Sequence, residues 1–82
     1  MIEVADTTLD RDRDVKIPLY GRSGIPEAWL FDLQSERVTV FRDCSPEGYR
    51  AESVANRDAI LSPGFDSAVR IELAQIWRVK GR

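Results

Sequence analysis

The sequence predicts an α/β chain of the α+β type, in which an antiparallel meander of strands follows one helix. Three observations lead to this prediction. A segment with helical character over residues 12–22 is followed by a nearly continuous apolar run over residues 28–33. A strictly alternating segment over residues 37–42 comes next, as expected for the second strand of a hairpin. Residues 49–54 alternate again and predict a third antiparallel strand near an edge of the sheet.

The chain opens with Ile2-Glu3-Val4, a carboxylate between two β-branched apolar residues. This pattern is typical of the end of a strand, and nothing precedes it, so we expect a domain that is truncated at its N-terminus. The sequence of residues 5–11, which come next, predicts a polar loop. The side chains suited to cap the following helix are Thr7, Thr8, Asp10 and Asp12.

The helix over residues 12–22 contains Pro18, and proline in a helix interior costs about 3 kcal/mol. Either the helix kinks there, or its regular part starts late. Gly24 is suited to the left-handed position just after the helix. The spacing predicts that Val15 and Leu19 face the core and that Ile17 is partly covered.

The apolar run over residues 28–33 predicts a central strand that is covered on both faces. A loop of about three residues joins it to the alternating strand, which places Val38 and Val40 on one face and Phe41 on the other. Cys44 lies in a predicted turn over residues 43–48. The sequence therefore predicts a meander that starts from a buried strand.

In the C-terminal third, the sequence predicts only short strands and helical turns. A short strand is centred on residues 60–61, and a turn at Pro63 separates it from a last short strand that contains Val69 and Ile71. Residues 72–77 predict a final helical turn or two, with Trp77 in the core.

Composition excludes several classes of function. The 82 residues make one small domain, and the net charge of −2 gives no strongly basic surface for nucleic acid. One cysteine and no histidine exclude an internal disulfide, a histidine-ligated zinc site and a Ser-His or Cys-His catalytic pair. The sequence has neither a signal peptide nor an apolar run of about 20 residues, so we expect a cytoplasmic protein without a membrane partner.

One constellation in the chain is suited to chemistry. Lys16 and Tyr20 share one helical face, where an ordinary core helix would carry apolar residues, and Glu3 lies on the preceding strand. The plainer interpretation is a solvated lysine paired with Asp12 and a phenol with its hydroxyl in water. The neighbouring cations are interleaved with acids, which favours a salt-bridged surface over a phosphate-binding one.

These residues resemble a known family. The motifs Glu3-Val4-Ala5-Asp6-Thr7-Thr8, Asp12-Arg13-x-x-Lys16-x-x-x-Tyr20 and Gly24-Ile25-Pro26-Glu27-x-Trp29-Leu30-x-Asp32 are similar to the Uma-two family of restriction endonucleases. That family belongs to the PD-(D/E)XK nuclease superfamily. The resemblance covers essentially the whole chain, and the motif spacing is most specific up to Asp32.

The resemblance implies a restriction-endonuclease-like mixed sheet and metal-dependent cleavage of DNA, with Mg²⁺ as the usual cofactor. Carried over position by position, Glu3 matches the strand carboxylate that holds the metal, and Lys16 matches the catalytic lysine, displaced onto the helix. Tyr20 and Asp6 are possible accessory residues. The family's first metal-binding aspartate lies upstream of Glu3, so residues 1–82 correspond to the C-terminal half of the domain. Asp6 and Asp32 are the local candidates for a second acid. Because a single carboxylate holds Mg²⁺ poorly, we expect weak or no metal binding by this chain alone.

Three hypotheses remain open at this point. The chain is a Mg²⁺-dependent endonuclease, a catalytically incomplete remnant with the nuclease fold, or a small interaction module with a chance match. A structure in which Glu3 and Lys16 lie far apart would favour the last. Absent upstream strands would also leave a sheet edge exposed, through which we expect the chain to form a homodimer.

Overall fold

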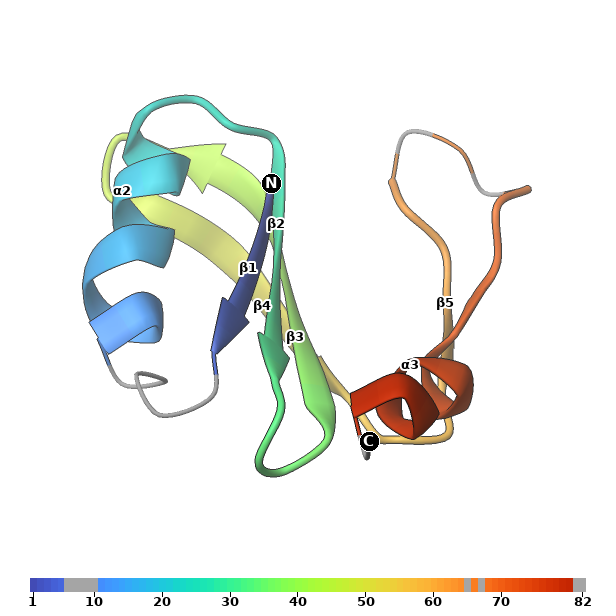
Figure 1. The fold of residues 1–82 in the computed structure, drawn as a ribbon. Helices are drawn as coiled ribbons and strands as arrows, with labels where there is room; N and C mark the ends of the chain where they lie inside the picture. Colours follow the sequence, from blue (N-terminus) through green and yellow to red (C-terminus); the bar gives the residue numbers. More distant parts are fainter. Residues whose placement is uncertain (6–10, 65, 67, 81–82) are drawn as a thin grey trace.

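The computed structural model describes residues 1–5, 11–64, 66 and 68–80 (Figure 1). It contains a four-stranded sheet with the order β1-β2-β3-β4 and a two-stranded sheet of β5 and β6. The elements in chain order are β1 (Ile2–Ala5), the π-helical segment η1 (Asp12–Lys16), α2 (Ile17–Arg22), β2 (Glu27–Asp32), β3 (Arg37–Ser45), β4 (Gly48–Ala55), β5 (Ile60–Leu61), β6 (Ile71–Glu72) and α3 (Leu73–Lys80).

The larger sheet is mixed, as predicted. β1 runs parallel to β2, whereas β2, β3 and β4 form an antiparallel meander. A parallel neighbour needs a crossover, and the helical segment between β1 and β2 supplies it. β2 lies between β1 and β3 and is buried along most of its length, which confirms the predicted central strand.

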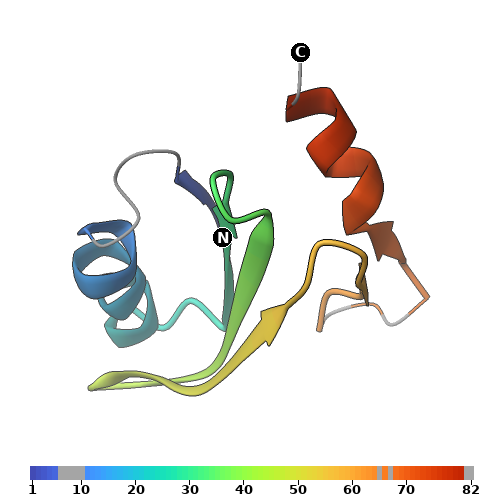
Figure 2. The same ribbon diagram turned by 90° about the horizontal axis from the view of Figure 1, so that it is seen from below.

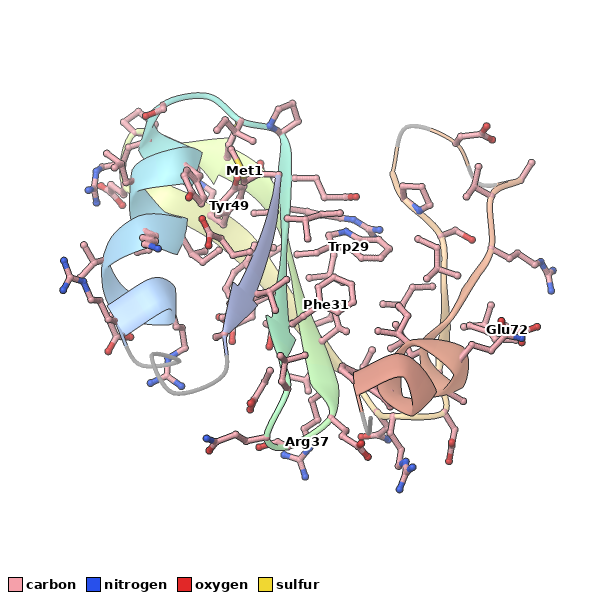
Figure 3. All side chains as sticks on the ribbon, viewed as in Figure 1. Met1, Trp29, Phe31, Arg37, Tyr49 and Glu72 are labelled. Carbon is pink, nitrogen blue, oxygen red and sulfur yellow. The ribbon has the colours of Figure 1, made fainter. Side chains whose placement is uncertain are left out.

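The sheet has one apolar cluster on each face. Figure 2 shows α2 on one side of the sheet and the C-terminal segment with α3 on the other. The α2 side is formed by Ala5, Ile17, Ala28, Leu30 and Phe41. The α3 side is formed by Trp29, Phe31, Val38, Val40, Leu73 and Trp77. Figure 3 shows the labelled Trp29 and Phe31 pointing toward the C-terminal segment, away from α2. The alternation predicted for β3 and the core position of Trp77 are therefore confirmed.

The helical segment covers the predicted residues but is not uniform. Its first part is π-helical, and the regular α-helix begins at Ile17 with Pro18 in the first turn. Of the two outcomes expected for Pro18, the structure shows the second: the regular helix starts late, so Pro18 lies in the first turn, where a missing N–H is harmless. The prediction that Val15 and Leu19 face the core is wrong: they are 55% and 50% exposed, whereas Ile17 is 2% exposed. The buried residues of α2 are Ile17 and Gly21, four positions apart on one helical face, so Leu19 between them points away from the sheet.

α2 ends in a Schellman motif, and its backbone packs directly against the sheet. The N–H of Ile25 donates to the carbonyl of Tyr20, and the N–H of Gly24 donates to that of Gly21. Gly24 has a φ of 84°, which confirms its predicted role after the helix. At Gly21 a Cβ atom would lie 2.6 Å from the carbonyl carbon of Gly48. The helix backbone therefore approaches the start of β4 as closely as a glycine allows.

The turns of the meander differ in detail from the prediction. The β2–β3 loop has four residues, 33–36, and Glu36 has a φ of 54°. β3 continues through Cys44 to Ser45, so Cys44 lies in a strand and not in a turn. The Ser45 hydroxyl accepts from the N–H of Glu47 and donates to the carbonyl of Gly48, and these bonds confine the turn to residues 46–47.

The C-terminal segment departs from the prediction at one residue. Val69 is exposed and its N–H donates to the carbonyl of Asp66, so it lies in a turn and not in the last strand. β6 pairs with β5, and α3 follows it at once. The N–H of Leu73, the first residue of α3, donates to the carbonyl of Ala59 just before β5. This bond fixes the helix start to the small sheet.

Candidate functional site

Glu3 projects from β1 onto the face of the sheet that α2 covers. It pairs in register with Leu30, which belongs to the same apolar cluster as Ile17. Partners in register point to the same side of a sheet, so the Glu3 carboxylate lies on the α2 side. Its neighbours Ile2 and Val4 point to the opposite side, since successive side chains alternate.

Lys16 and Tyr20 converge on this carboxylate from the helical segment. Tyr20 donates a hydrogen bond from its hydroxyl to Glu3 Oε1, and Lys16 Nζ lies 3.9 Å from Glu3 Oε2. The two predicted catalytic residues are therefore brought together, although they are distant in sequence. The phenol of Tyr20 is not in water as the plainer interpretation expects, because it is bonded to Glu3.

The arrangement combines a hydrogen-bonded carboxylate with an exposed cation. Glu3 and Tyr20 are partly buried, and their contact is a direct hydrogen bond. Lys16 is exposed, and its contact with Glu3 is at the long end of the range for an ion pair. The ammonium group of an exposed lysine, on a long flexible side chain, is suited to contact an anionic group placed beside Glu3.

The two candidates for a second acid have different outcomes. Asp32 lies at the end of β2, where its Oδ1 accepts hydrogen bonds from the N–H groups of Gln34 (3.1 Å) and Ser35 (3.3 Å). This pattern is an Asx-type turn and accounts for the buried carboxylate by a structural role. Asp6 lies outside the described residues, as do Thr7, Thr8 and Asp10, which were predicted as helix caps.

The described residues do not by themselves make a Mg²⁺ site. Mg²⁺ takes oxygen ligands in a near-octahedral shell, with one or two carboxylates and several waters or phosphate oxygens. Across residues 1–5, 11–64, 66 and 68–80, no group of three potential metal-ligating side chains occurs. Glu3 is one carboxylate, and both of its oxygens already face Tyr20 or Lys16. A complete site needs at least one further acid.

A second acid-centred cluster, missed by sequence reasoning, lies on the other face of the sheet. Glu27, the first residue of β2, accepts hydrogen bonds from Arg42 Nε (2.5 Å), Trp29 Nε1 (2.9 Å) and the N–H of Gly64 (3.1 Å). Arg42 also donates to the carbonyl of Ser62 at 3.1 Å. These bonds join the meander to the segment after β5. The cluster is therefore a structural link between the two sheets.

The environment of Glu27 favours its charged form. Partial burial raises the pKa of the carboxyl group, but the hydrogen bonds it accepts and the positive charge of Arg42 outweigh burial. The pKa of Glu27 therefore lies below its ordinary value of 4.5. The available sequence signal was a charged residue at the start of a buried strand, two positions before a tryptophan that needs a hydrogen-bond acceptor.

Tyr49 fixes the other end of α2. Its ring packs on Phe41 with centroids 5.9 Å apart, and its hydroxyl donates to the carbonyl of Ile25 at 2.7 Å. Burial raises the pKa of this phenol, with smaller contributions from Cys44 and Glu27. Figure 3 shows Tyr49 between the sheet and α2. The loop that follows α2 is therefore held against β4, which keeps the helix in position over the sheet.

Two further expectations concern surfaces. Arg13 Nε lies 3.2 Å from Asp14 Oδ1 at an exposed position, in agreement with a salt-bridged surface around the helical segment. Among the helices in the described part of the chain, none is long and apolar enough to cross a membrane.

Comparisons with known proteins give a family and a fold. The family model Uma2, described as "Putative restriction endonuclease", matches residues 1–74. A crystal structure of a "putative nuclease belonging to DUF820" from Anabaena variabilis matches with a TM-score of 0.67 and 22% sequence identity. The alignment covers 95% of this chain but only 42% of that protein. A search of curated proteins found no match.

Proposed function

The chain belongs to the Uma2 family, described as "Putative restriction endonuclease", and we propose that it contributes part of the active site of a Mg²⁺-dependent endonuclease that hydrolyses DNA phosphodiester bonds. In this proposal Glu3 and Lys16 are the catalytic residues, and Glu3 is also a metal ligand. Tyr20 is a positioning residue for Glu3. The fold shared with the DUF820 protein from Anabaena variabilis supports the proposal at the level of architecture.

The convergence of Tyr20 and Lys16 on Glu3 is the observation that carries this proposal. Hydrolysis of a phosphodiester builds negative charge on the phosphoryl oxygens, and a nearby ammonium group stabilises that charge. Lys16 is exposed and close enough to Glu3 to serve a phosphate bound beside the carboxylate. The hydrogen bond from Tyr20 restricts the Glu3 side chain to one orientation. A bound Mg²⁺ would supply Lewis-acid activation of water.

The proposal requires an additional acid beyond Glu3. Because the chain spans 42% of the length of the structurally similar DUF820 protein, the activity of a whole family member is itself a proposal for this chain. The second carboxylate would come from Asp6 or from another copy of the chain. Asp32 is a poor candidate, since its carboxylate caps the β2–β3 turn.

A catalytically incomplete remnant with the nuclease fold is the second candidate. The single carboxylate of the Glu3 site, in a described part of the chain without a three-ligand cluster, favours it. The small interaction module is less well supported, because the family match covers residues 1–74 and Glu3 lies beside Lys16.

Calorimetric titration with Mg²⁺ and Mn²⁺, followed by plasmid nicking with the same samples, tests the proposal. With the second acid that the proposal requires in place, the wild type binds metal and nicks DNA, and Glu3→Gln loses both. Lys16→Ala should keep metal binding and lose nicking. Glu36→Gln is the matched control, since Glu36 is also a partly buried acid in an ion pair, with Arg57 at 3.4 Å, and should behave as wild type.

The outcomes separate the candidates. No metal binding and no nicking by the wild type would support the remnant. Nicking that persists in Glu3→Gln would contradict the assignment of Glu3.

A further inference from the structure

The carboxylate of Glu3 has a different kind of partner on each of its two oxygens. The hydroxyl of Tyr20 donates a hydrogen bond to Oε1, and Nζ of Lys16 lies 3.9 Å from Oε2. Lys16 is the last residue of η1 and Tyr20 lies in α2, so both partners come from the helical segment that crosses over the sheet. One partner is a neutral donor and the other is a cation.

The partner on Oε1 is held in place by the core. The ring of Tyr20 packs against the apolar cluster on the α2 side of the sheet, and Tyr20 and Glu3 are both partly buried. A phenol fixed by packing can leave the carboxylate only if the helix moves or the ring repacks. A ligand that approaches Glu3 therefore meets an occupied oxygen at Oε1.

The partner on Oε2 is easier to displace. The side chain of Lys16 is 47% exposed, compared with 18% for Glu3. An exposed ion pair at this distance is weak, because water screens the two charges and the long side chain has other conformations. Oε2 is therefore the oxygen at which a ligand can replace the present partner.

We propose that Lys16 is a built-in competitor for divalent cations at Glu3, so that a cation binds to Oε2 only as the ammonium group moves away. Mg²⁺ contacts a carboxylate oxygen at about 2.1 Å. Nζ of Lys16 is 3.9 Å from the same oxygen, and like charges this close repel each other. The inference rests on the proposed function, because it takes Glu3 as a metal ligand.

The number of carboxylates at the site makes this competition effective. Across the residues that the structure describes, no group of three potential metal-ligating side chains includes Glu3. One carboxylate balances one positive charge, and Lys16 already supplies that charge. A second acid would allow a cation and the ammonium group to remain side by side. With Glu3 alone they compete, which is a physical reason for weak metal binding.

The competition also couples the metal to an anionic ligand. Lys16 keeps its charge when it leaves Oε2, and its long side chain is suited to contact a phosphate placed beside Glu3. Because linkage is reciprocal, an anion that draws the ammonium group away from Oε2 tightens the binding of the cation.

Calorimetric titration of the full chain with Mn²⁺, after treatment with EDTA, tests this inference. Lys16→Met keeps a straight side chain, removes the charge and adds no oxygen ligand. We expect Lys16→Met to bind Mn²⁺ about three- to tenfold more tightly than the wild type. Lys16→Arg keeps the charge and should bind Mn²⁺ no more tightly than the wild type.

Arg22→Met is the matched control for the change in net charge. Arg22 is an exposed cation in the last turn of α2, and its loss changes the net charge by the same amount as the loss of Lys16. It should change the affinity for Mn²⁺ by about twofold or less, because solvent and salt screen distant charges. Circular dichroism confirms that each variant is folded.

Nuclear magnetic resonance follows Lys16 without a substitution at this residue. The chain has two lysines, Lys16 and Lys80, so their ε-methylene signals can be separated and Lys80 serves as the internal reference. Saturating Mg²⁺ should move the Lys16 signal of the wild type toward its position in Glu3→Gln without metal, because the ion pair is lost in both. A Lys16 signal that stays in place while Mg²⁺ binds would overturn the inference.

The two proposals fail differently. Metal binding by the wild type, with no greater affinity in Lys16→Met than in Arg22→Met, would refute the competition and leave the nuclease proposal standing. No binding by the wild type, with clear binding by Lys16→Met, would support the competition and refute a nuclease site that works in this chain. No binding by either protein would refute both.

Discussion

The close approach of the α2 backbone to β4 predicts that Gly21→Ala destabilises the protein, although alanine has the higher helix propensity. The added Cβ would lie 2.6 Å from the carbonyl carbon of Gly48, 2.8 Å from the nitrogen of Tyr49 and 2.9 Å from the Cα of Gly48. These atoms all belong to the backbone of β4, so no side-chain rotation can relieve the clash. The helix must move away from the sheet.

The magnitude follows from two opposing contributions. Overpacking a well-filled site costs typically about 1–3 kcal/mol, and a backbone clash belongs to the upper part of that range. Replacing glycine by alanine inside a helix returns about 1 kcal/mol. We therefore expect the free energy of unfolding to fall by about 1–2 kcal/mol, which lowers the Tm of a domain of this size by about 5–15 °C.

Differential scanning calorimetry and urea unfolding monitored by far-UV circular dichroism measure this change. Leu19→Ala is the matched control, since it lies in the same helix with a half-exposed side chain and should change stability by at most about 0.5 kcal/mol. A Gly21→Ala protein that is as stable as the wild type, or more stable, would refute the close approach. The same variant should weaken the contact of Tyr20 with Glu3, because Tyr20 is adjacent to Gly21 on the displaced helix.

Three further predictions test other parts of the fold. Ile17→Ala should lower the free energy of unfolding in urea by about 2–5 kcal/mol, whereas Val15→Ala should change it by at most about 0.5 kcal/mol, because only Ile17 is buried. Similar losses for both variants would contradict the assignment of Ile17 to the buried face of the helix. Trp77→Ala should cost about 3–5 kcal/mol, and a cost below 1 kcal/mol would mean that α3 does not cover the sheet. Glu27→Gln should lower the Tm at pH 7. Because the pKa of the Glu27 carboxyl group is lowered in the folded state, the charged carboxylate stabilises the fold above the unfolded pKa of 4.5, and this stabilisation is lost as the pH falls below 4.5 and through the lower pKa of the folded state. The Tm difference between Glu27→Gln and wild type should therefore shrink in acid, and a constant difference from pH 7 to pH 3 would contradict this role.

The fold was predictable where the residues interact with near neighbours. The alternation of Val38 and Val40 against Phe41 assigned both faces of β3, because period-two patterning reports burial directly. The end of α2 was predictable from Gly24, since few other residues adopt a positive φ at low cost.

The helical phase was not predictable from the same kind of evidence. Val15 and Leu19 were expected to face the core because both are large and apolar. The face that packs on the sheet is instead the one with Ile17 and Gly21, and a glycine in that face gives no hydrophobic signal in the sequence. Cys44 shows a related limit, because its place in β3 depends on bonds made by Ser45 to the turn beyond it.

The candidate site was predictable only in part. The resemblance to a family identified Glu3 and Lys16, and the structure places them together. The bond from Tyr20 to Glu3 depends on where the helix lies over the sheet, which spacing alone does not determine. The Glu27 cluster joins segments that are distant in sequence, and such long-range pairing is not visible in a single sequence.

The division of aromatic side chains between the two faces of the sheet makes each half of the protein visible to its own optical probe. The chain has two tryptophans and two tyrosines. Trp29 and Trp77 belong to the cluster beneath α3, whereas Tyr20 and Tyr49 pack against the cluster beneath α2. Tryptophan emission therefore reports release of the C-terminal segment, and tyrosine absorbance reports release of the helix that carries Lys16. Coincident melting of the two signals would show that the faces unfold as one unit, and separate transitions would show which half opens first.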